Sequence, residues 1–400
     1  MTSKPPKAAL PSGIWILGIG EDGLLGLSAT ARGKIDTADI LVGGARHLAF
    51  VTVQSAQRID WTDGIEAVLD TLESQLNKDI VVLASGDPLY FGVAKNFIDR
   101  FGAARVQVLP VPGAVSLTCA ALGWSQPDIQ VVTVHGRPLE SLNLYLTPGA
   151  QLVVLSENGE TPNQVAKLLA AQGFGPSLMT VLEHLGGDQE DRYQGIASSW
   201  AHPRAADLNT LAIDVVADPS ARSFSRVAGL PDDAFEHDGQ LTKRATRAVT
   251  LSSLAPLPGQ MLWDLGAGAG SISIEWMRSH ESNRAVAVER DSVRAKRMAA
   301  NAARLGVPKL IIEVCENLHA VQTLTGVPDA IFIGGGILTP GLIDAAWTRL
   351  KPGGRLVANA VTDESRTLLN TLNQKYGGTL MEMSITGKLP ITQYVVEKDL

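Results

Sequence analysis

Short apolar runs that end in turn residues alternate with stretches of helical spacing along most of the chain. In the first half these runs are "IWILGIG", "DIVVLASGDP", "VQVLPVPG" and "IQVVTVHG", which begin at residues 14, 79, 106 and 129. Residues 64–77 and 90–101 have the spacing of amphipathic helices. Continuous apolar runs with helices between them are typical of parallel strands covered on both faces. The pattern therefore predicts an α/β fold.

The alternation continues past residue 137. Further β-rich runs begin at residues 151, 178 and 209, and a helix is predicted near 162–172. We interpret residues 10–220 as one domain with two lobes, at about 10–136 and 137–218. The apolar signal then lapses over residues 219–240, which are rich in Pro, Gly, Ser and Asp, and this segment is predicted to be a linker.

A second α/β block occupies residues 241–400. It begins with a predicted helix at about 241–254, and helices separate the strands that follow. The strands are expected near residues 260–265, 285–289, 310–314, 329–333, 355–359, 378–385 and 391–397. A chain of 400 residues suits two domains of this kind better than a single core.

Composition adds limits on location and partners. No apolar run reaches the length that spans a bilayer, and residues 1–12 lack the apolar stretch of a signal peptide, so we expect a loose cytosolic tail on a cytoplasmic protein. The formal net charge of −7 argues against a nucleic-acid partner, because phosphate binding needs a basic face. Cys119 and Cys315 lie far apart without CxxC spacing and are expected to be buried free thiols.

The sharpest motif is "LWDLGAGAGSISIEWM", residues 262–277. A predicted strand delivers the chain to Gly266, Gly268 and Gly270, and a helix is predicted directly after them. Glycines allow the backbone to approach a bound nucleotide closely and to adopt positive φ. The next predicted strand ends in Glu289, whose carboxylate can accept both ribose hydroxyls of an adenosine.

The spacing of this loop distinguishes two kinds of nucleotide site. A dinucleotide fingerprint has its third glycine three positions after the second, where this chain has Ser271. Instead, Asp264-x-Gly-x-Gly-x-Gly resembles motif I of the class I S-adenosylmethionine methyltransferases. The resemblance implies a Rossmann-like domain with a seven-stranded mixed sheet, in which Asp264 steers the loop or meets the amino-acid end of S-adenosylmethionine. It assigns further cofactor contacts to Thr242, Ala267, Ala269, Glu316 and Asn317.

Five segments of the first half resemble a different methyltransferase family. They are "LGIGEDGLLGLS", "LASGDPLYFG", "VPGAVSLTCAALGW", "VVTVHGR" and "LSENGETP", beginning at residues 17, 83, 111, 131 and 155. They are similar to segments of the tetrapyrrole methylases, the class III methyltransferases, whose cofactor lies in a cleft between two α/β lobes. Glu21 and Asp22 depart from that family's pattern, which has Pro-Gly there. The resemblance assigns a second S-adenosylmethionine site to Gly86, Asp87, Leu89, Val115 and Ser116.

A tetrapyrrole methylase domain ahead of a class I methyltransferase resembles a two-domain family of cobalamin biosynthesis. This implies methylation of a precorrin macrocycle at carbon 5 by the front half. The rear half would methylate carbon 15 and decarboxylate the ring C acetate, with two S-adenosylmethionine sites per chain. A meso carbon conjugated to ring nitrogens is already electron-rich, so we assign no catalytic side chain. The histidines lack ligand spacing, so no metal is expected, and analogy with class I relatives suggests a homo-oligomer.

A precorrin is a polycarboxylate, so an acidic chain must gather positive charge locally. "LTKRATR" places Lys243, Arg244 and Arg247 in one predicted helix, and arginine can hold a carboxylate with two hydrogen bonds. The alternative is a solvated helix face. In the front half, Arg46, His47 and the run His135-Gly136-Arg137 are further candidates.

A glycine triplet follows the strand predicted near 329–333. These residues leave room for a bulky planar substrate, although a tight turn is the alternative reading of Gly334, Gly335 and Gly336.

Two other functions stay open at this point. The chain could methylate a protein or an RNA with its front half as a non-catalytic binding module, although the acidic balance disfavours RNA. Alternatively, one half has lost catalysis, and the departure at Glu21 and Asp22 makes the front half the candidate. The number of cofactor equivalents bound per chain separates these readings.

Overall fold

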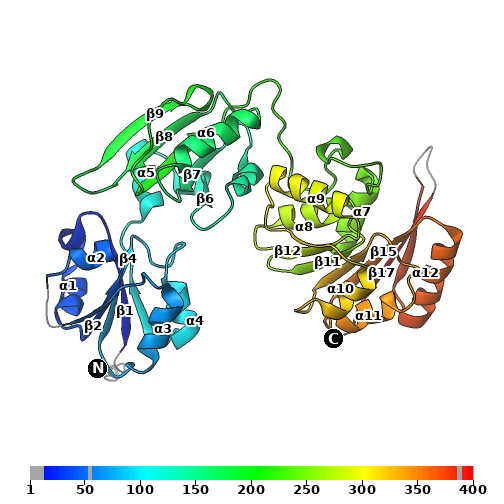
Figure 1. Ribbon diagram of the computed structural model, residues 1–400, viewed down its shortest axis with the longest axis horizontal. Helices are drawn as coiled ribbons and strands as arrows, with labels where there is room; N and C mark the ends of the chain where they lie inside the picture. The colour runs from blue at the N-terminus through cyan, green and yellow to red at the C-terminus, as the bar shows by residue number, and fades with distance from the viewer. Residues whose placement is uncertain (1–12, 53–55, 385–389, 400) are drawn as a thin grey trace, which may run out of the picture. The chain divides into compact units, whose positions relative to one another are not determined.

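The computed structural model describes residues 13–52, 56–384 and 390–399, and the tail expected at residues 1–12 lies outside them. The chain forms two compact units (Figure 1). Unit 1 contains residues up to Gly136 and Gly149–Ala221, and unit 2 contains Arg137–Pro148 and Arg222–Leu400. Within the described ranges, no helix is both long and apolar enough to cross a bilayer.

The first sheet of unit 1 is parallel and has the strand order β3-β2-β4-β1-β5. Alternate residues of its central strands enter different core clusters. Ile16 and Val82 pack in one cluster, while Leu17 and Leu83 pack in the other, so both faces are covered as the apolar runs predict. The elements are β1 Ile14–Ile19, α1 Ala29–Asp36, β2 Ile40–Gly43, α2 Ala45–Ala49, β3 Gln57–Ile59, α3 Ile65–Glu73, β4 Ile80–Ser85, α4 Ala94–Phe101 and β5 Val106–Leu109.

The second sheet of unit 1 differs from the expected parallel arrangement. Its order is β6-β7-β10-β8-β9, and among neighbouring strands only β6 and β7 pair in parallel. Strand β10 lies antiparallel between β7 and β8, and β8 and β9 also pair antiparallel. Its elements are α5 Ala114–Leu122, β6 Gln130–Thr133, β7 Gln151–Leu155, α6 Thr161–Ala171, β8 Leu178–Glu183, β9 Asp191–Ile196 and β10 Asn209–Asp214. The pattern missed β9, whose residues are mostly exposed, and also β2 and β3 of the first sheet.

Unit 2 contains the mixed sheet of seven strands that the class I resemblance implies, in the order β13-β12-β11-β14-β15-β17-β16. The order in which the chain adds parallel strands reverses at β11, with β12 and β13 on one side of it and β14 and β15 on the other. Parallel α/β sheets bind ligands at such a switch point. The elements are α7 Arg244–Leu254, β11 Met261–Leu265, α8 Ser271–Ser279, β12 Arg284–Val288, α9 Ser292–Arg304, β13 Ile311–Glu313, α10 Asn317–Thr323, β14 Ala330–Ile333, α11 Leu342–Arg349, β15 Arg355–Ala360, α12 Asp363–Tyr376, β16 Thr379–Met383 and β17 Ile391–Glu397.

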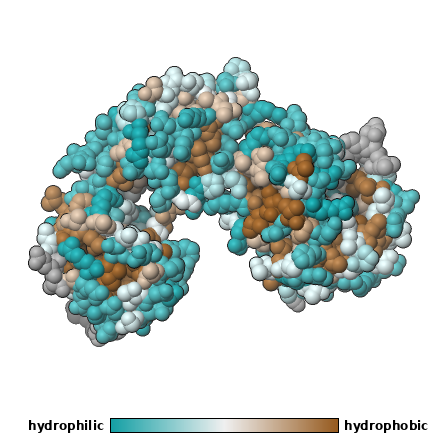
Figure 2. Space-filling model, in the orientation of Figure 1, coloured by the Kyte–Doolittle hydropathy of each residue, from teal (hydrophilic) through white to brown (hydrophobic). Residues whose placement is uncertain are grey.

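Short 3-10 helices occur in both units. They are η1 Gly23–Gly26, η2 Gln126–Asp128, η3 Leu139–Tyr145, η4 Ala197–Ser199 and η5 Asp232–Ala234. In the view of Figure 2 the surface is largely hydrophilic, with apolar patches on both units.

Most of the segment predicted to be a linker is part of unit 2. Leu230 and Phe235 are buried in its core, and the backbone N–H groups of Gly229 and Leu230 donate to the Glu275 carboxylate on α8. A Pro- and Gly-rich composition therefore marks irregular structure here and not a free connection. These contacts fold the segment onto the domain that follows it.

Residues 137–148 also leave the lobe to which the sequence pattern assigned them. They carry η3, whose Leu142 and Leu144 are buried, and the Asn143 amide donates to the carbonyl of Ala303 in α9 at 3.1 Å. Gly306, just beyond α9, lies directly under Leu144 at φ +83°. This segment, inserted between β6 and β7, is packed on unit 2.

We expect Gly306→Ala to destabilise the protein more than a matched glycine substitution. A Cβ at Gly306 would overlap the backbone of Leu144, which adds about 1–3 kcal/mol of overpacking to the cost of a positive φ. Gly326→Ala is the control, because Gly326 has φ +85° with nothing within 4 Å, so it bears only the conformational cost of about 1–2 kcal/mol. Denaturant unfolding measures both. Equal losses would show that residues 137–148 do not pack against α9 in solution.

Candidate functional site

The glycine loop between β11 and α8 has the geometry that its sequence predicts. Gly266, Gly268 and Gly270 have φ of +76°, +60° and +77°, a region that side chains disfavour. A Cβ on Gly266 would lie 2.8 Å from the backbone nitrogen of Gly335, in the glycine triplet that follows β14. Two glycine-rich loops at neighbouring strand ends therefore pack backbone against backbone.

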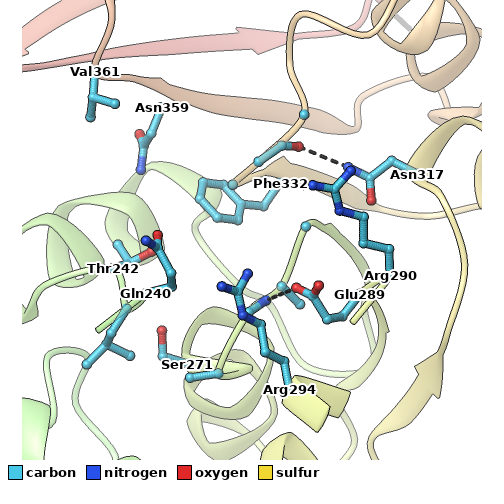
Figure 3. A pocket seen from close by; sticks show the side chains of 18 of the residues that line it. Gln240, Thr242, Ser271, Glu289, Arg290, Arg294, Asn317, Phe332, Asn359 and Val361 are labelled. Carbon is cyan, nitrogen blue, oxygen red and sulfur yellow. Dashed lines mark hydrogen bonds between the residues drawn. The ribbon is translucent and has the colours of Figure 1, made fainter. Parts of the chain in front are cut away.

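A cavity of about 470 Å³ opens beside these two loops (Figure 3). Its walls come from the carboxyl ends of β11, β12, β14 and β15, from the segment before α7, and from the starts of α8, α9 and α10. The sequence-predicted residues that line it are Thr242, Lys243, Gly266, Ala267, Gly268, Ala269, Glu289, Glu316, Asn317, Gly334, Gly335 and Gly336. The structure thus brings most of the rear-half candidates together.

Glu289, directly after β12, is buried and forms part of the cavity wall. One carboxylate oxygen accepts from the Gly268 N–H at 2.9 Å, and the other accepts from the Asp291 N–H at 3.0 Å. Each oxygen keeps a lone pair beyond these bonds. The loop and the acidic residue are therefore fixed to each other, with acceptor capacity left for a ligand.

Asp264 lies behind the loop and does not line the cavity. Its carboxylate accepts from the backbone N–H and the hydroxyl of Ser273, at 3.2 and 2.6 Å. Burial raises the pKa of Asp264 to about 6, the bonds from Ser273 oppose the rise, and the charge of Glu289 adds to it. Of the two roles expected for Asp264, the contacts support steering of the loop.

Glu316 and Asn317 begin α10 at the side of the cavity that holds Glu289. The Asn317 amide donates to the carbonyl of Gly335 at 2.9 Å and ties α10 to the glycine triplet. Glu316 is exposed and pairs with Arg290 at 3.6 Å. Both residues can reach a ligand in the cavity.

The three basic residues predicted to hold substrate separate in space. Lys243 lines the cavity, whereas Arg244 is exposed and lies outside the cavity lining. Arg247 is fully buried: its Nε donates to Glu275 at 2.5 Å, and other guanidinium nitrogens reach Asp232 and the Leu230 carbonyl. The assignment of Arg247 to substrate was therefore wrong, because its charge is used to anchor the segment before α7.

Other cationic side chains in the cavity wall were missed. Arg290 and Arg294 follow Glu289 at the start of α9, and both line the cavity. Arg294 pairs with Asp238 at 2.8 Å. Their sequence signal was available, since "ERDSVR" places two arginines within five positions of the acidic residue already singled out.

Unit 1 contains a second, smaller cavity of about 80 Å³. Both sheets of the unit contribute to its wall, and Glu21 contacts both sides: its carboxylate pairs with Arg46 and accepts from His184 Nδ1 at 3.0 Å. Burial, together with the charge of Arg46, lowers the pKa of the neighbouring His47 to about 4, so that this imidazole is neutral near pH 7. The departure from the family pattern at Glu21 thus falls in the cavity wall.

Of the residues assigned to the front cofactor site, only Gly86 lines this cavity, and Arg46, a front-half substrate candidate, lines it as well. The Asp87 carboxylate accepts from the Leu89 N–H at 2.9 Å and closes a turn, and Leu89 is exposed. Val115 is buried in a core cluster, and the Ser116 hydroxyl accepts from Gln126 at 3.3 Å. Contacts of these four residues with a cofactor stay predictions.

Arg247→Met is expected to lower the free energy of unfolding by about 3–5 kcal/mol, because it leaves the buried Glu275 carboxylate without a cation. Adding Glu275→Gln should recover part of the loss, since no unpaired charge remains. Arg244→Met, a change to an exposed arginine of the same helix, should alter stability by less than about 0.5 kcal/mol. Urea unfolding is the measurement. A stable Arg247→Met variant with weakened substrate binding would restore Arg247 to the substrate site.

Asp264→Asn should remove part of the pH dependence of stability. The folded-state pKa of about 6 exceeds the unfolded value of 3.8, so the folded protein binds the proton more tightly. The stabilisation that this proton provides is present at low pH and is lost as the pH rises through about 6. The unfolding free energy of the variant minus that of the wild type should therefore rise by up to about 3 kcal/mol between pH 4 and pH 7. Denaturation at several pH values tests this, and a flat difference would contradict it.

Comparison with known proteins identifies the family. Residues 13–199 match the family model of the tetrapyrrole (corrin/porphyrin) methylases, and residues 233–396 match a precorrin methyltransferase domain. A precorrin-6Y C(5,15)-methyltransferase [decarboxylating] from Sinorhizobium sp is 41% identical over 97% of this chain and 94% of its own length. One from Mycobacterium tuberculosis is 38% identical over 96% of this chain and 100% of its own.

Among solved structures, the C-terminal domain of precorrin-6Y C5,15-methyltransferase from Rhodobacter capsulatus is 38% identical and covers 44% of this chain and 100% of its own, at a TM-score of 0.41. The alignments with the Sinorhizobium and Mycobacterium relatives cover nearly all of this chain and nearly all of each relative. Each relative therefore contains both halves in one polypeptide. The chain therefore belongs to the family of precorrin-6Y C(5,15)-methyltransferases (decarboxylating).

Proposed function

We propose that this protein transfers methyl groups from S-adenosylmethionine to carbons 5 and 15 of a precorrin macrocycle and decarboxylates its ring C acetate, in cobalamin biosynthesis. The observation that carries the proposal is the match at 41% identity over 97% of the chain to an enzyme named for this reaction. A protein or RNA substrate, the alternative left open by the sequence, has no support from these relatives.

The division of labour follows the two halves, with carbon 5 assigned to the front half and carbon 15 and decarboxylation to the rear half. Two shorter relatives support it. One is named cobalt-precorrin-7 C(5)-methyltransferase, the other is named probable cobalt-precorrin-6B C(15)-methyltransferase (decarboxylating), and each aligns with 44% of this chain. The two reactions thus occur in separate proteins of about half this length.

The rear cavity fits the methyl donor. Its volume of about 470 Å³ lies within the usual range for small-molecule sites, about 300–1,000 Å³. The glycine loop permits close approach, and Glu289 retains acceptor capacity for ribose hydroxyls. When bound, S-adenosylmethionine supplies an electrophilic methyl group on a sulfonium. The residues of this chain fix the orientation of the donor and exclude water. This lowers the barrier to methyl transfer because the reacting atoms are held in alignment.

Two sites answer a geometric problem in the substrate. Carbons 5 and 15 lie on opposite sides of the macrocycle, and one rigid pocket cannot present a methyl group in line with both. The front cavity of about 80 Å³ is smaller than a donor of this size needs, so binding there requires the two lobes of unit 1 to move apart. Such an opening would separate the Glu21 carboxylate from His184, because Glu21 and Arg46 both belong to the first lobe and His184 to the second.

Titration of the full-length protein with S-adenosylmethionine tests the proposal directly. We expect two equivalents to bind per chain, and about one equivalent for Glu289→Gln, which weakens the rear site by removing a charged acceptor. With a late precorrin, mass spectrometry should show two methyl groups gained and one carbon dioxide lost. One equivalent in the wild type would indicate a non-catalytic half, and no mass change would refute the assignment. Cytoplasmic location and homo-oligomer assembly stay predictions.

A further inference from the structure

A buried polar network closes the side of the rear cavity opposite the cofactor loop. Asn359, in β15, and Gln393, in β17, form a cross-strand pair, so their side chains share one face of the sheet. On that face they meet Thr250 of α7, with both amides directing nitrogen atoms at its hydroxyl oxygen at 3.0 Å. Only Asn359 of these three lines the cavity (Figure 3).

The network fixes which way the Asn359 amide faces. The Thr250 hydroxyl donates its proton to the backbone carbonyl of Thr246 at 2.8 Å, so toward the two amides it can only accept. Asn359 and Gln393 must therefore both present nitrogen to it. The second N–H of Gln393 donates to Asn359 Oδ1 at 2.9 Å, and the Ser253 hydroxyl donates to Gln393 Oε1 at 2.6 Å. A backbone carbonyl of α7 thus sets the orientation of both amides.

This arrangement leaves one N–H of Asn359 without a partner in the described part of the chain. The carbonyl oxygen of the amide is held by Gln393 and one N–H by Thr250, and the residue is only partly buried, at the cavity wall. Thr246 also lines the cavity, but its hydroxyl is buried and has no partner among the described residues. The unused N–H of Asn359 is therefore the group with hydrogen-bonding capacity to offer a ligand.

The position of Asn359 excludes the adenosine of the donor as its ligand. Glu289 follows β12, and Asn359 lies in β15, three strands away across β11 and β14. Three strand spacings of about 4.8 Å place the two residues roughly 14 Å apart. Figure 3 shows them on opposite sides of the cavity. Asn359 therefore lies beyond the adenosine, on the side of the cavity that we assign to the methyl acceptor.

We propose that Asn359 binds a carboxylate arm of the tetrapyrrole through its unused N–H, and that Gln393 is a positioning residue that fixes the orientation of the Asn359 amide. The proposal rests on the proposed function, which makes the substrate a polycarboxylate. The arm is one that the reaction retains, because a hydrogen bond to the departing carboxylate would stabilise the ground state and oppose decarboxylation. The site is distinct from the cationic side chains near the cofactor loop.

The test compares two replacements of the same residue in the full-length protein. Release of carbon dioxide from the precorrin is followed at saturating S-adenosylmethionine. Asn359→Asp keeps the size of the side chain and the oxygen that accepts from Gln393, but it loses the bond to Thr250 and places a negative charge at the arm. Asn359→Leu removes the donor together with the bonds to Gln393 and Thr250 and adds no charge. We expect KM for the precorrin to rise about tenfold to hundredfold in Asn359→Leu, the size of one hydrogen bond to a charged group, and further in Asn359→Asp, with kcat little changed.

Gln393→Met tests the positioning role. It should raise KM about threefold to tenfold while kcat and the affinity for S-adenosylmethionine stay unchanged, a split that a general loss of folding would not produce. Asn370→Asp, the same chemical change at an exposed position on α12, is the matched control and should have no effect. Thermal unfolding of each variant reports whether it folds.

The outcomes separate the two levels of inference. An Asn359→Asp variant that binds precorrin as well as Asn359→Leu, or better, would overturn the carboxylate assignment. Weakened S-adenosylmethionine binding in either variant would place Asn359 in the donor site instead. If the wild type releases no carbon dioxide from a precorrin, the proposed function fails and this inference fails with it. A working wild type with unchanged KM in both variants would refute the inference alone.

Discussion

The close approach of two glycine-rich loops at the ends of β11 and β14 is the constraint on which the rear site depends. The backbones of Gly266 and Gly335 pack directly against each other, and a side chain on Gly266 would collide with the backbone of Gly335. The Asn317 amide bonds the carbonyl of Gly335, and the Glu289 carboxylate bonds the N–H of Gly268. The cavity therefore has one rigid wall, built of backbone, that sets where a ligand can lie.

Buried charge in unit 2 serves mainly to hold this wall in place. Glu275 on α8 accepts from two backbone N–H groups of the segment before α7 and from Arg247, so that one carboxylate organises the entry to the domain. Asp264 does the same for the turn into α8 through Ser273. Because both groups are desolvated, each is costly to leave without its partners. Charges that can meet a substrate lie elsewhere, at Lys243, Arg290 and Arg294 in the cavity wall.

The sequence predicted what is local and missed what depends on distant partners. The turn at Gly266 to Gly270 and the helix after it were predictable, because glycine spacing and apolar periodicity act within a few residues. The role of Arg247 was not, since its burial depends on Glu275, 28 positions away. The insertion of β10 between β7 and β8 and the packing of residues 137–148 on unit 2 likewise follow from long-range contacts. Asn359 was not predicted from the sequence, because its orientation depends on Thr250 and Gln393.

The inserted segment bears on how the two halves are joined. Residues 137–148 pack on unit 2, although the chain on either side of them belongs to unit 1, so the polypeptide passes between the units three times, near residues 136, 148 and 221. A single flexible linker would let the halves be cut apart without loss. Here a cut near residue 225 would strip unit 2 of buried Leu142 and Leu144 and expose them on the other fragment. The rear domain therefore includes a segment inserted in the front half of the chain, so the connection between the two halves is part of the fold of the rear domain and not only a tether.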